Sequence, residues 1–174
     1  MIMKKILFSL IALMAVMTVQ AQSICGTWRT VQPMVETDEN GSLQIQNWTF
    51  TFNEDGTFNS VVEATVSIEP EPMMALEIAW SLDVSGTYTL DGDQLTTTPN
   101  LDTKKVEVQS VSMNGEVIED PSVIKNLESL FNGSDVVNVD IFGLTSTVKV
   151  TDQMIEITQD GETMQLMRFS TIKN

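Results

Sequence analysis

The side chains that most often carry out enzyme chemistry are sparse in this sequence. It contains no histidine, which excludes Ser-His-Asp and Cys-His arrangements and imidazole zinc sites. The one cysteine, Cys25, has no basic neighbour before Arg29 that would activate its thiol, and alone it forms no internal disulfide. Paired carboxylates could serve a glycosidase, but among 24 acidic residues some pair always looks suitable. We therefore expect that the protein is not an enzyme.

Metal and cofactor sites are also not indicated. The acidic turns at residues 53–56 and 91–93 lack the Asp-x-Asp-x-Asp-Gly spacing and following Glu of a calcium loop. Their glycines instead supply the positive φ that tight hairpin turns require. No Gly-rich phosphate loop occurs. We expect no metal and no cofactor.

The charge balance excludes one class of partner. The chain has 24 acidic and 9 basic residues, a net charge of −15, so it is repelled by nucleic-acid phosphates and by anionic membrane surfaces. The acidic residues are spread along the chain without a run, a pattern that favours a role in solubility over an acidic recognition patch. We expect no nucleic-acid partner.

The first 21 residues have the pattern of a removable export signal. Lys4 and Lys5 precede an apolar stretch, and cleavage after Ala21 fits the residues there. The apolar stretch is shorter than the roughly 20 residues that a membrane-spanning helix needs, and no later segment approaches that length. We expect residues 22–174 to form one periplasmic or secreted domain without a transmembrane segment.

Cys25 offers an alternative, in which it would be the lipid-carrying N-terminus of the mature chain. Lipoprotein signals have a small residue just before the cysteine, whereas this chain has Ile24. Cys25 also directly precedes the first predicted strand, with no tether between them. These two features argue against a lipid anchor.

The clearest structural pattern is an alternation of period two over residues 58–68 and 74–82. This period is typical of a strand with one dry and one wet face. Pro70 and Pro72 lie between the two runs and cannot donate to a ladder. The pattern predicts two antiparallel strands joined by an exposed corner.

Similar runs cover most of the chain, at residues 23–31, 43–52, 85–90, 106–113, 137–141, 144–150, 155–157 and 164–169. Residues 34–42 and 96–102 are expected to be polar connections. About eight to ten strands with short turns predict an all-β, antiparallel up-and-down barrel. A β-sandwich has similar turn spacing and is the alternative.

The run at residues 43–52 contains a conflict of phase. Leu43 and Ile45 lie on odd positions, whereas Trp48 and Phe50 lie on even ones. Since a one-residue slip moves every side chain to the other face, we predict a β-bulge near residues 46–47.

One helix interrupts the strands, at residues 121–132. Asp120 is placed to cap its N-terminus, Pro121 suits the first helical position, and Gly133 can take a left-handed C-terminal conformation. A helix this short needs packing to be stable, so its apolar stripe must dock. We favour a plug or a position on the barrel wall, and a lid over a ligand is the alternative. The stripe comprises Val123, Ile124, Leu127, Leu130 and Phe131.

Gly26-Thr27-Trp28 on the first strand, followed by an all-β meander and by Arg168 near the end, resembles the lipocalin-like branch of the calycin superfamily. That resemblance includes the small exported lipocalin-like proteins of bacteria. It implies that Trp28 plugs the closed end of the barrel and that Arg168 packs across its ring, cation against π-face. Gly26, Trp28 and Arg168 are therefore expected to seal this end. The resemblance also implies that the loop at residues 34–42 borders the open mouth.

The resemblance further implies a binding protein for a small apolar molecule. A barrel of about eight strands either is filled by its own side chains or holds one small ligand. Each candidate lining residue is equally explained as core. Arg168 is the charge expected near an anionic head group. The candidate lining residues are Trp48, Phe50, Phe58, Val62, Val66, Leu76, Ile78, Trp80 and Tyr88.

A second function remains open, that of a protein-interaction or inhibitor module built on a filled barrel. Its contact surface would comprise Met73, Met74, the proline corner and the acidic loop at residues 34–42. The sequence does not decide between the two, because the volume inside the barrel decides it.

Overall fold

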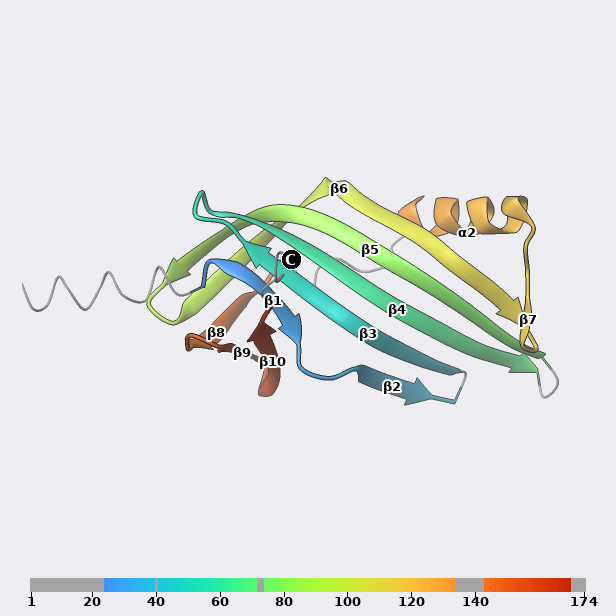
Figure 1. Cartoon of the computed structure of the whole chain (residues 1–174), viewed down its shortest axis with the longest axis horizontal. Helices are drawn as coiled ribbons and strands as arrows, with labels where there is room; N and C mark the ends of the chain where they lie inside the picture. Colours follow the sequence, from blue (N-terminus) through green and yellow to red (C-terminus); the bar gives the residue numbers. More distant parts are fainter. Residues whose placement is uncertain (1–23, 40, 72–73, 134–142, 170–174) are drawn as a thin grey trace, which may run out of the picture.

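The computed structural model describes residues 24–39, 41–71, 74–133 and 143–169. The predicted leader, part of the proline corner and the predicted strand at 137–141 lie outside these residues. The described elements are β1 (Gly26–Thr30), β2 (Met34–Asp38), β3 (Gly41–Phe52), β4 (Thr57–Glu71), β5 (Met74–Asp91), β6 (Gln94–Met113), β7 (Glu116–Val117), α2 (Pro121–Gly133), β8 (Thr145–Val150), β9 (Met154–Gln159) and β10 (Glu162–Arg168) (Figure 1).

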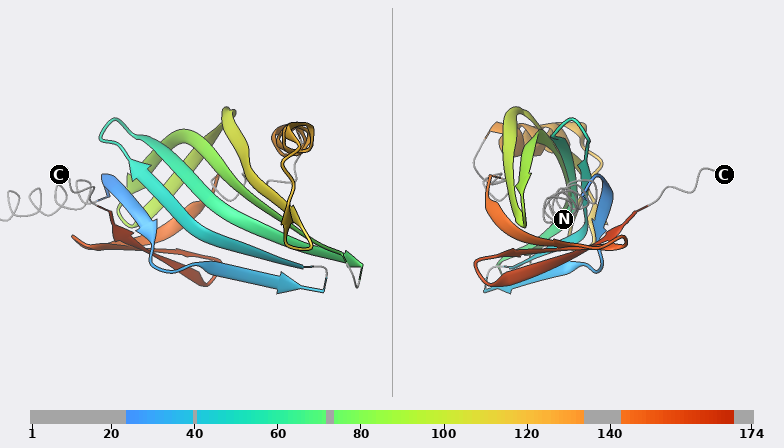
Figure 2. Two further views of the ribbon diagram at one scale, coloured as in Figure 1. Left: turned by 45° about the vertical axis from the view of Figure 1, so that its right-hand side comes forward. Right: turned by 90° about the vertical axis from the view of Figure 1, so that its left-hand side faces the viewer.

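The strands form one antiparallel sheet that closes on itself. Its order is β1-β10-β9-β8-β6-β5-β4-β3-β2, and β1 pairs with β3 as well as with β10. That additional pairing completes a ring and leaves β2 outside it, while β7 pairs only with β6. The end-on view in Figure 2 shows the strands curving around a common axis. The predicted up-and-down barrel is confirmed.

The two most regular runs form the longest hairpin predicted from the sequence. β4 and β5 pair from Thr57↔Thr87 to Ile68↔Leu76, and after a register shift the pairing resumes at the corner with Glu71↔Met74. Phe58 and Leu82 on the predicted dry face are buried. Ile68 and Met74, near the corner, are exposed, so the dry face ends before the tip of the hairpin.

The predicted polar loop at residues 34–42 is wrong at both ends, because residues 34–38 and 41–42 belong to strands β2 and β3. Met34–Asp38 is strand β2, which pairs with β3 from Met34↔Ile45 to Asp38↔Gly41. The Gly41 amide donates a hydrogen bond of 3.0 Å to Asp38 Oδ1 and so fixes the turn. Polar composition concealed the strand because most of its side chains are exposed, whereas its backbone is paired on one edge.

The predicted connection at residues 96–102 is also wrong. This segment belongs to β6, where Thr97 pairs with Tyr88 and Asn100 with Ser85. Its threonines are β-branched and suit a strand despite their polarity. The register then jumps to Asp83↔Lys105, so residues 101–104 form a large irregularity. Figure 1 shows the sharp bend of β6.

The predicted bulge in β3 is confirmed. The register between β3 and β4 shifts between Ile45 and Asn47, close to the expected position. The shift moves the apolar residues after it onto the face that Leu43 and Ile45 already occupy. One strand therefore presents its apolar side chains to the barrel interior on both sides of the bulge.

The helix α2 begins as predicted. The Ser122 amide donates to Asp120 Oδ1 at 2.8 Å, which is an N-cap. The hydrogen bonds to Ser122 lower the pKa of the Asp120 carboxyl. Gly133 is the last helical residue and its φ lies outside the left-handed region, because it still belongs to the last turn. The predicted left-handed C-terminal conformation is wrong.

Helix α2 docks along the side of the barrel. β6 pairs with β8 only at Gln94, Leu95 and Thr96. Further along β6, a side chain of α2 provides hydrogen bonds to the β6 backbone. Asn132 accepts from the Val106 amide at 2.8 Å and donates to the Val106 carbonyl at 2.9 Å. The helix therefore takes the place of a neighbouring strand on β6, which corresponds to the predicted wall position (Figure 1).

The hydrophobic core is concentrated inside the ring of strands. Cys25, the one cysteine of the chain, is a free thiol, so no disulfide within the chain stabilises the fold. Among the described residues, no helix has the length and hydropathy needed to cross a lipid bilayer. The largest fully buried apolar side chains are Trp28, Phe52, Phe58, Ile24, Leu82, Ile155, Leu166, Val84 and Val111.

Candidate functional site

The closed end of the barrel is organised around Trp28. Its side chain is fully buried, and its Nε1 donates to the Ile24 carbonyl at 2.7 Å. The pairings of β1 place it between Phe50 and Arg168. Arg168 Cζ lies 4.1 Å from the centroid of the indole ring, the geometry of a cation–π contact.

Arg168 is held at this end by backbone carbonyls as well. Its Nη1 donates to the Cys25 carbonyl at 3.1 Å and its Nε to the Asp152 carbonyl at 2.8 Å. A Cβ on Gly26 would lie 2.7 Å from Arg168 Nη1, and Gly26 has a φ of +129°. Gly26 therefore leaves the space that the guanidinium fills, and the three predicted seal residues meet at one place.

Tyr88 lies beside this end. Its hydroxyl donates to the Asn53 carbonyl at 2.8 Å and lies 3.4 Å from Cys25 Sγ, and its ring packs edge-on against Phe52 with centroids 5.0 Å apart. Burial, followed by the contact with Cys25, raises the pKa of the Tyr88 phenol well above its ordinary value of 10.0.

This raised pKa gives a direct test, because Tyr88 is the one tyrosine of the chain. Below pH 10 the phenol is protonated in both states and its contribution to stability is full and constant; above it, the unfolded chain loses the proton first. We expect no phenolate absorbance from the native protein near pH 10, and a free energy of unfolding that falls as the pH rises further. Ultraviolet titration of native and urea-unfolded protein measures both, and coincident curves would contradict the assignment.

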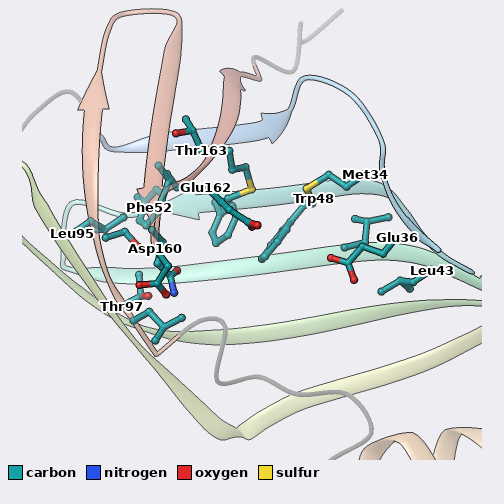
Figure 3. A pocket seen from close by; sticks show the side chains of 17 residues that line it. Met34, Glu36, Leu43, Trp48, Phe52, Leu95, Thr97, Asp160, Glu162 and Thr163 are labelled. Carbon is teal, nitrogen blue, oxygen red and sulfur yellow. The ribbon is translucent and has the colours of Figure 1, made fainter. Parts of the chain in front are cut away.

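A second feature is a cavity of about 540 Å³, a volume within the range of small-molecule sites. It lies between β2 and β3 on one side and the β9–β10 hairpin on the other, with further lining from β6 and β8 (Figure 3). None of its lining residues comes from α2. They are Met34, Glu36, Leu43, Ile45, Trp48, Phe50, Phe52, Leu95, Thr97, Leu144, Ser146, Ile157, Gln159, Asp160, Glu162, Thr163 and Met164.

One wall of the cavity is the apolar face of β3. The bulge brings Leu43 and Ile45 to the same side as the three aromatic residues that follow. The Trp48 and Phe50 rings stack with centroids 5.2 Å apart, and the Phe50 and Phe52 rings with centroids 5.9 Å apart. Trp48 Nε1 donates to Ser60 Oγ at 2.9 Å, so the indole presents its apolar surface without an unsatisfied donor.

The opposite wall combines apolar and polar side chains. Ile157 and Met164 contribute apolar surface from β9 and β10.

Three carboxylates complete the lining, Glu36 on β2, Asp160 in the β9–β10 turn and Glu162 on β10. Among the described residues that line the cavity there is no lysine or arginine. Arg168 is not one of them, and its expected position near a ligand head group stays a prediction.

The structure divides the nine candidate lining residues into two groups. Trp48 and Phe50 line the cavity. The other seven do not: Phe58, Val62 and Ile78 are buried in the core, and Val66, Leu76, Trp80 and Tyr88 are half-buried against it. These seven residues were predicted from a regular alternation of apolar and polar side chains. That alternation is typical of the best-packed strands, whose inward side chains form the core. Contact of any of the nine with a ligand remains a prediction.

Sequence reasoning missed most of the lining, although two signals pointed to it. The phase conflict in residues 43–52 implies that Leu43, Ile45 and Phe52 share a face with Trp48 and Phe50. The alternation at 155–157 and 164–169 likewise places Ile157 and Met164 on inward faces. The acidic lining residues gave no such signal, because turn and edge carboxylates look the same anywhere on a surface.

The arrangement is one for binding. Within the described residues, no group of three or more Cys, Asp or Glu side chains is placed to hold a metal ion. The cavity offers instead a stacked aromatic wall with a few polar groups, the usual composition of a small-molecule site.

A search of curated proteins found no match. A comparison with protein families, in contrast, supports the interpretation of the fold as one for binding. Residues 24–119, more than half of the chain, match the family described as the lipocalin-like domain. The matched part contains Gly26, Trp28 and the whole aromatic wall of the cavity, whereas Arg168 lies beyond it. With the closed antiparallel barrel and the matched residues, the chain belongs to the family of lipocalin-like domains.

Proposed function

We propose that this protein is an exported lipocalin-like binding protein that carries one small apolar molecule in the cavity beside Trp48 and Phe50. The lipocalin-like barrel is a binding-protein fold, which fits this role. The observation that carries the proposal is the cavity of about 540 Å³ against a stacked aromatic wall.

The alternative of a filled barrel explains this volume less well. Apolar surface that stays in contact with water forgoes the stabilisation that its burial would give. The rest of the interior is closely filled, with Trp28, Phe58 and Leu82 almost inaccessible. A barrel that served only as a scaffold for loops would have no reason to leave one wall of aromatic rings uncovered.

We include export in the proposal because the first 21 residues have the pattern of a signal peptide. Their positive start, apolar stretch and cleavage site at Ala21 fit a signal peptide. The net negative charge of −15, spread along the chain, favours solubility and fits a periplasmic or secreted location. The mass of the mature protein measured in the experiment below, expected to begin at Gln22, tests this part.

A matched pair of substitutions on β10 tests the binding site. Met164 lines the cavity, whereas Met167 on the same strand is exposed and does not. We expect Met164→Trp to fill the cavity and reduce binding of the neutral dye N-phenylnaphthylamine at least tenfold, a change of about 1.4 kcal/mol. Met167→Trp should bind the dye like the wild type. Fluorescence titration of the three proteins measures the dissociation constants.

The natural ligand is sought by native mass spectrometry of the three proteins purified from the producing cell. Wild type and Met167→Trp should retain a mass that denaturation releases, and Met164→Trp should not. Equal dye binding by all three proteins would place the binding site elsewhere. A bare polypeptide mass together with no dye binding would overturn the carrier function.

A further inference from the structure

Among the described residues, all ionisable side chains that line the cavity have the same sign. Glu36 reaches it from β2, and Asp160 and Glu162 reach it from the β9–β10 hairpin (Figure 3). They belong to two separate parts of the barrel and so surround the cavity from different sides. The field inside an apolar pocket lined in this way favours positive charge.

No ion pair within the described residues joins a basic side chain to one of these three carboxylates. The two ion pairs found there join Arg29 to Glu63 and Lys105 to Glu107, and neither includes a cavity residue. Arg168 is engaged at the closed end by Trp28 and two carbonyl oxygens. A ligand entering the cavity therefore meets the three carboxylates without a protein counter-charge among the described residues.

Ser146 provides a second, independent sign of a polar ligand atom. Its side chain lines the cavity and the residue is only 8 % exposed. Within the described residues its hydroxyl has no protein hydrogen-bond partner and is not among the atoms sealed from solvent, so it is open to a molecule in the cavity. A ligand with an N–H or O–H group would satisfy the Ser146 oxygen.

We propose that the cavity selects cationic amphiphiles of the alkylamine type and disfavours anionic ones such as fatty-acid carboxylates. This inference rests on the proposed function, since it names the ligand class of the same cavity. The apolar tail would lie along the Trp48–Phe50 wall. The ammonium group would be attracted by Glu36, Asp160 and Glu162 and could donate to Ser146, whereas a carboxylate is repelled by all three acids.

Three probes with the same tail and different head groups test the selection. Dodecylammonium, dodecanol and dodecanoate are titrated separately into the full mature protein by calorimetry, below their aggregation concentrations and at low salt. We expect dodecylammonium to bind roughly tenfold or more tightly than dodecanoate, with dodecanol between them. The difference should shrink in high salt, because screening weakens charge interactions.

Two triple variants with the same change in net charge show where the selection originates. Glu36→Gln/Asp160→Asn/Glu162→Gln should abolish the difference between dodecylammonium and dodecanoate. Glu77→Gln/Asp102→Asn/Glu116→Gln, at exposed positions that do not line the cavity, should keep it. Ser146→Ala should weaken dodecylammonium binding about threefold, by loss of one hydrogen bond.

The outcomes separate this inference from the proposed function. If dodecanol binds and the wild type does not prefer the ammonium probe, the charge selection is wrong and the carrier function stands. Persistence of the preference in the first triple variant would likewise overturn it. If none of the three probes binds, the proposed function fails and the inference fails with it.

Discussion

Trp28→Ala is expected to lower the free energy of unfolding by about 3–5 kcal/mol, the range for removing a large aromatic side chain from a core. Trp28 is fully buried, and the substitution deletes its ring, the Nε1 hydrogen bond to Ile24 and the surface beneath Arg168. The guanidinium would then lose its cation–π partner inside the closed end. Urea denaturation followed by circular dichroism measures the change.

Trp80→Ala is the matched control, since it deletes the same atoms. Trp80 is half-buried, with its ring 6.4 Å from that of Phe131 on α2, and no Trp80 side-chain hydrogen bond is found within the described residues. We expect its loss to be clearly smaller. A Trp28→Ala protein as stable as Trp80→Ala would show that the closed end does not hold the barrel together.

Much of the fold could be predicted because period-two alternation reports burial directly. Phe58 and Leu82 alternate with polar neighbours, and both are buried on paired strands. The phase conflict between Ile45 and Trp48 had one economical solution, a bulge, and the register shift occurs there. The Asp120 cap was equally readable, since a local hydrogen bond depends on sequence spacing alone.

Elements without an apolar face were not predictable in this way. β2 exposes most of its side chains, and the Thr97 segment of β6 is polar, so neither shows alternation although both have paired backbones. Backbone hydrogen bonds do not depend on side-chain hydropathy. These segments are strands because β2 can pair with β3 and this part of β6 with β5. The positions of β3 and β5 depend on the whole closed ring.

The cavity was unpredictable for a related reason. An inward-facing side chain has the same sequence pattern whether it meets other side chains or empty space. Trp48 and Phe58 both lie on apolar faces, yet only Trp48 lines the cavity. The difference depends on how far β3 lies from β9 and β10, a property of the closed ring and not of any one strand.

The geometry separates stability from binding along the barrel. Near one end, Gly26, Trp28 and Arg168 are in contact, and the guanidinium is held by the indole ring and two carbonyl oxygens. Beyond it, Trp48 faces a cavity whose described lining contains acidic residues and no basic ones. Phe50, which pairs with Trp28 and lines the cavity, joins the two regions. Substitutions in the seal should therefore act on folding, and those around Trp48 on ligand affinity.

Gly86→Ala is expected to be the second strongly destabilising substitution, at about 3 kcal/mol, the upper end for overpacking. Gly86 has no left-handed φ, so the backbone itself would accept alanine. A Cβ would nevertheless lie 2.2 Å from the Thr98 carbonyl oxygen and 2.7 Å from Phe58 Cε1. The Thr98 oxygen belongs to the backbone of β6, and Phe58 is buried, so neither can move without disturbing the sheet.

Gly133→Ala is the control for this substitution. A Cβ there meets open space, and the residue has no left-handed φ at the end of α2, so alanine should leave stability unchanged or raise it by up to about 1 kcal/mol. Urea denaturation of both variants gives the comparison. Equal stability of Gly86→Ala and wild type would mean that β5 and β6 separate easily at Thr98, and the tight packing of Phe58 against Gly86 would then not fix their register.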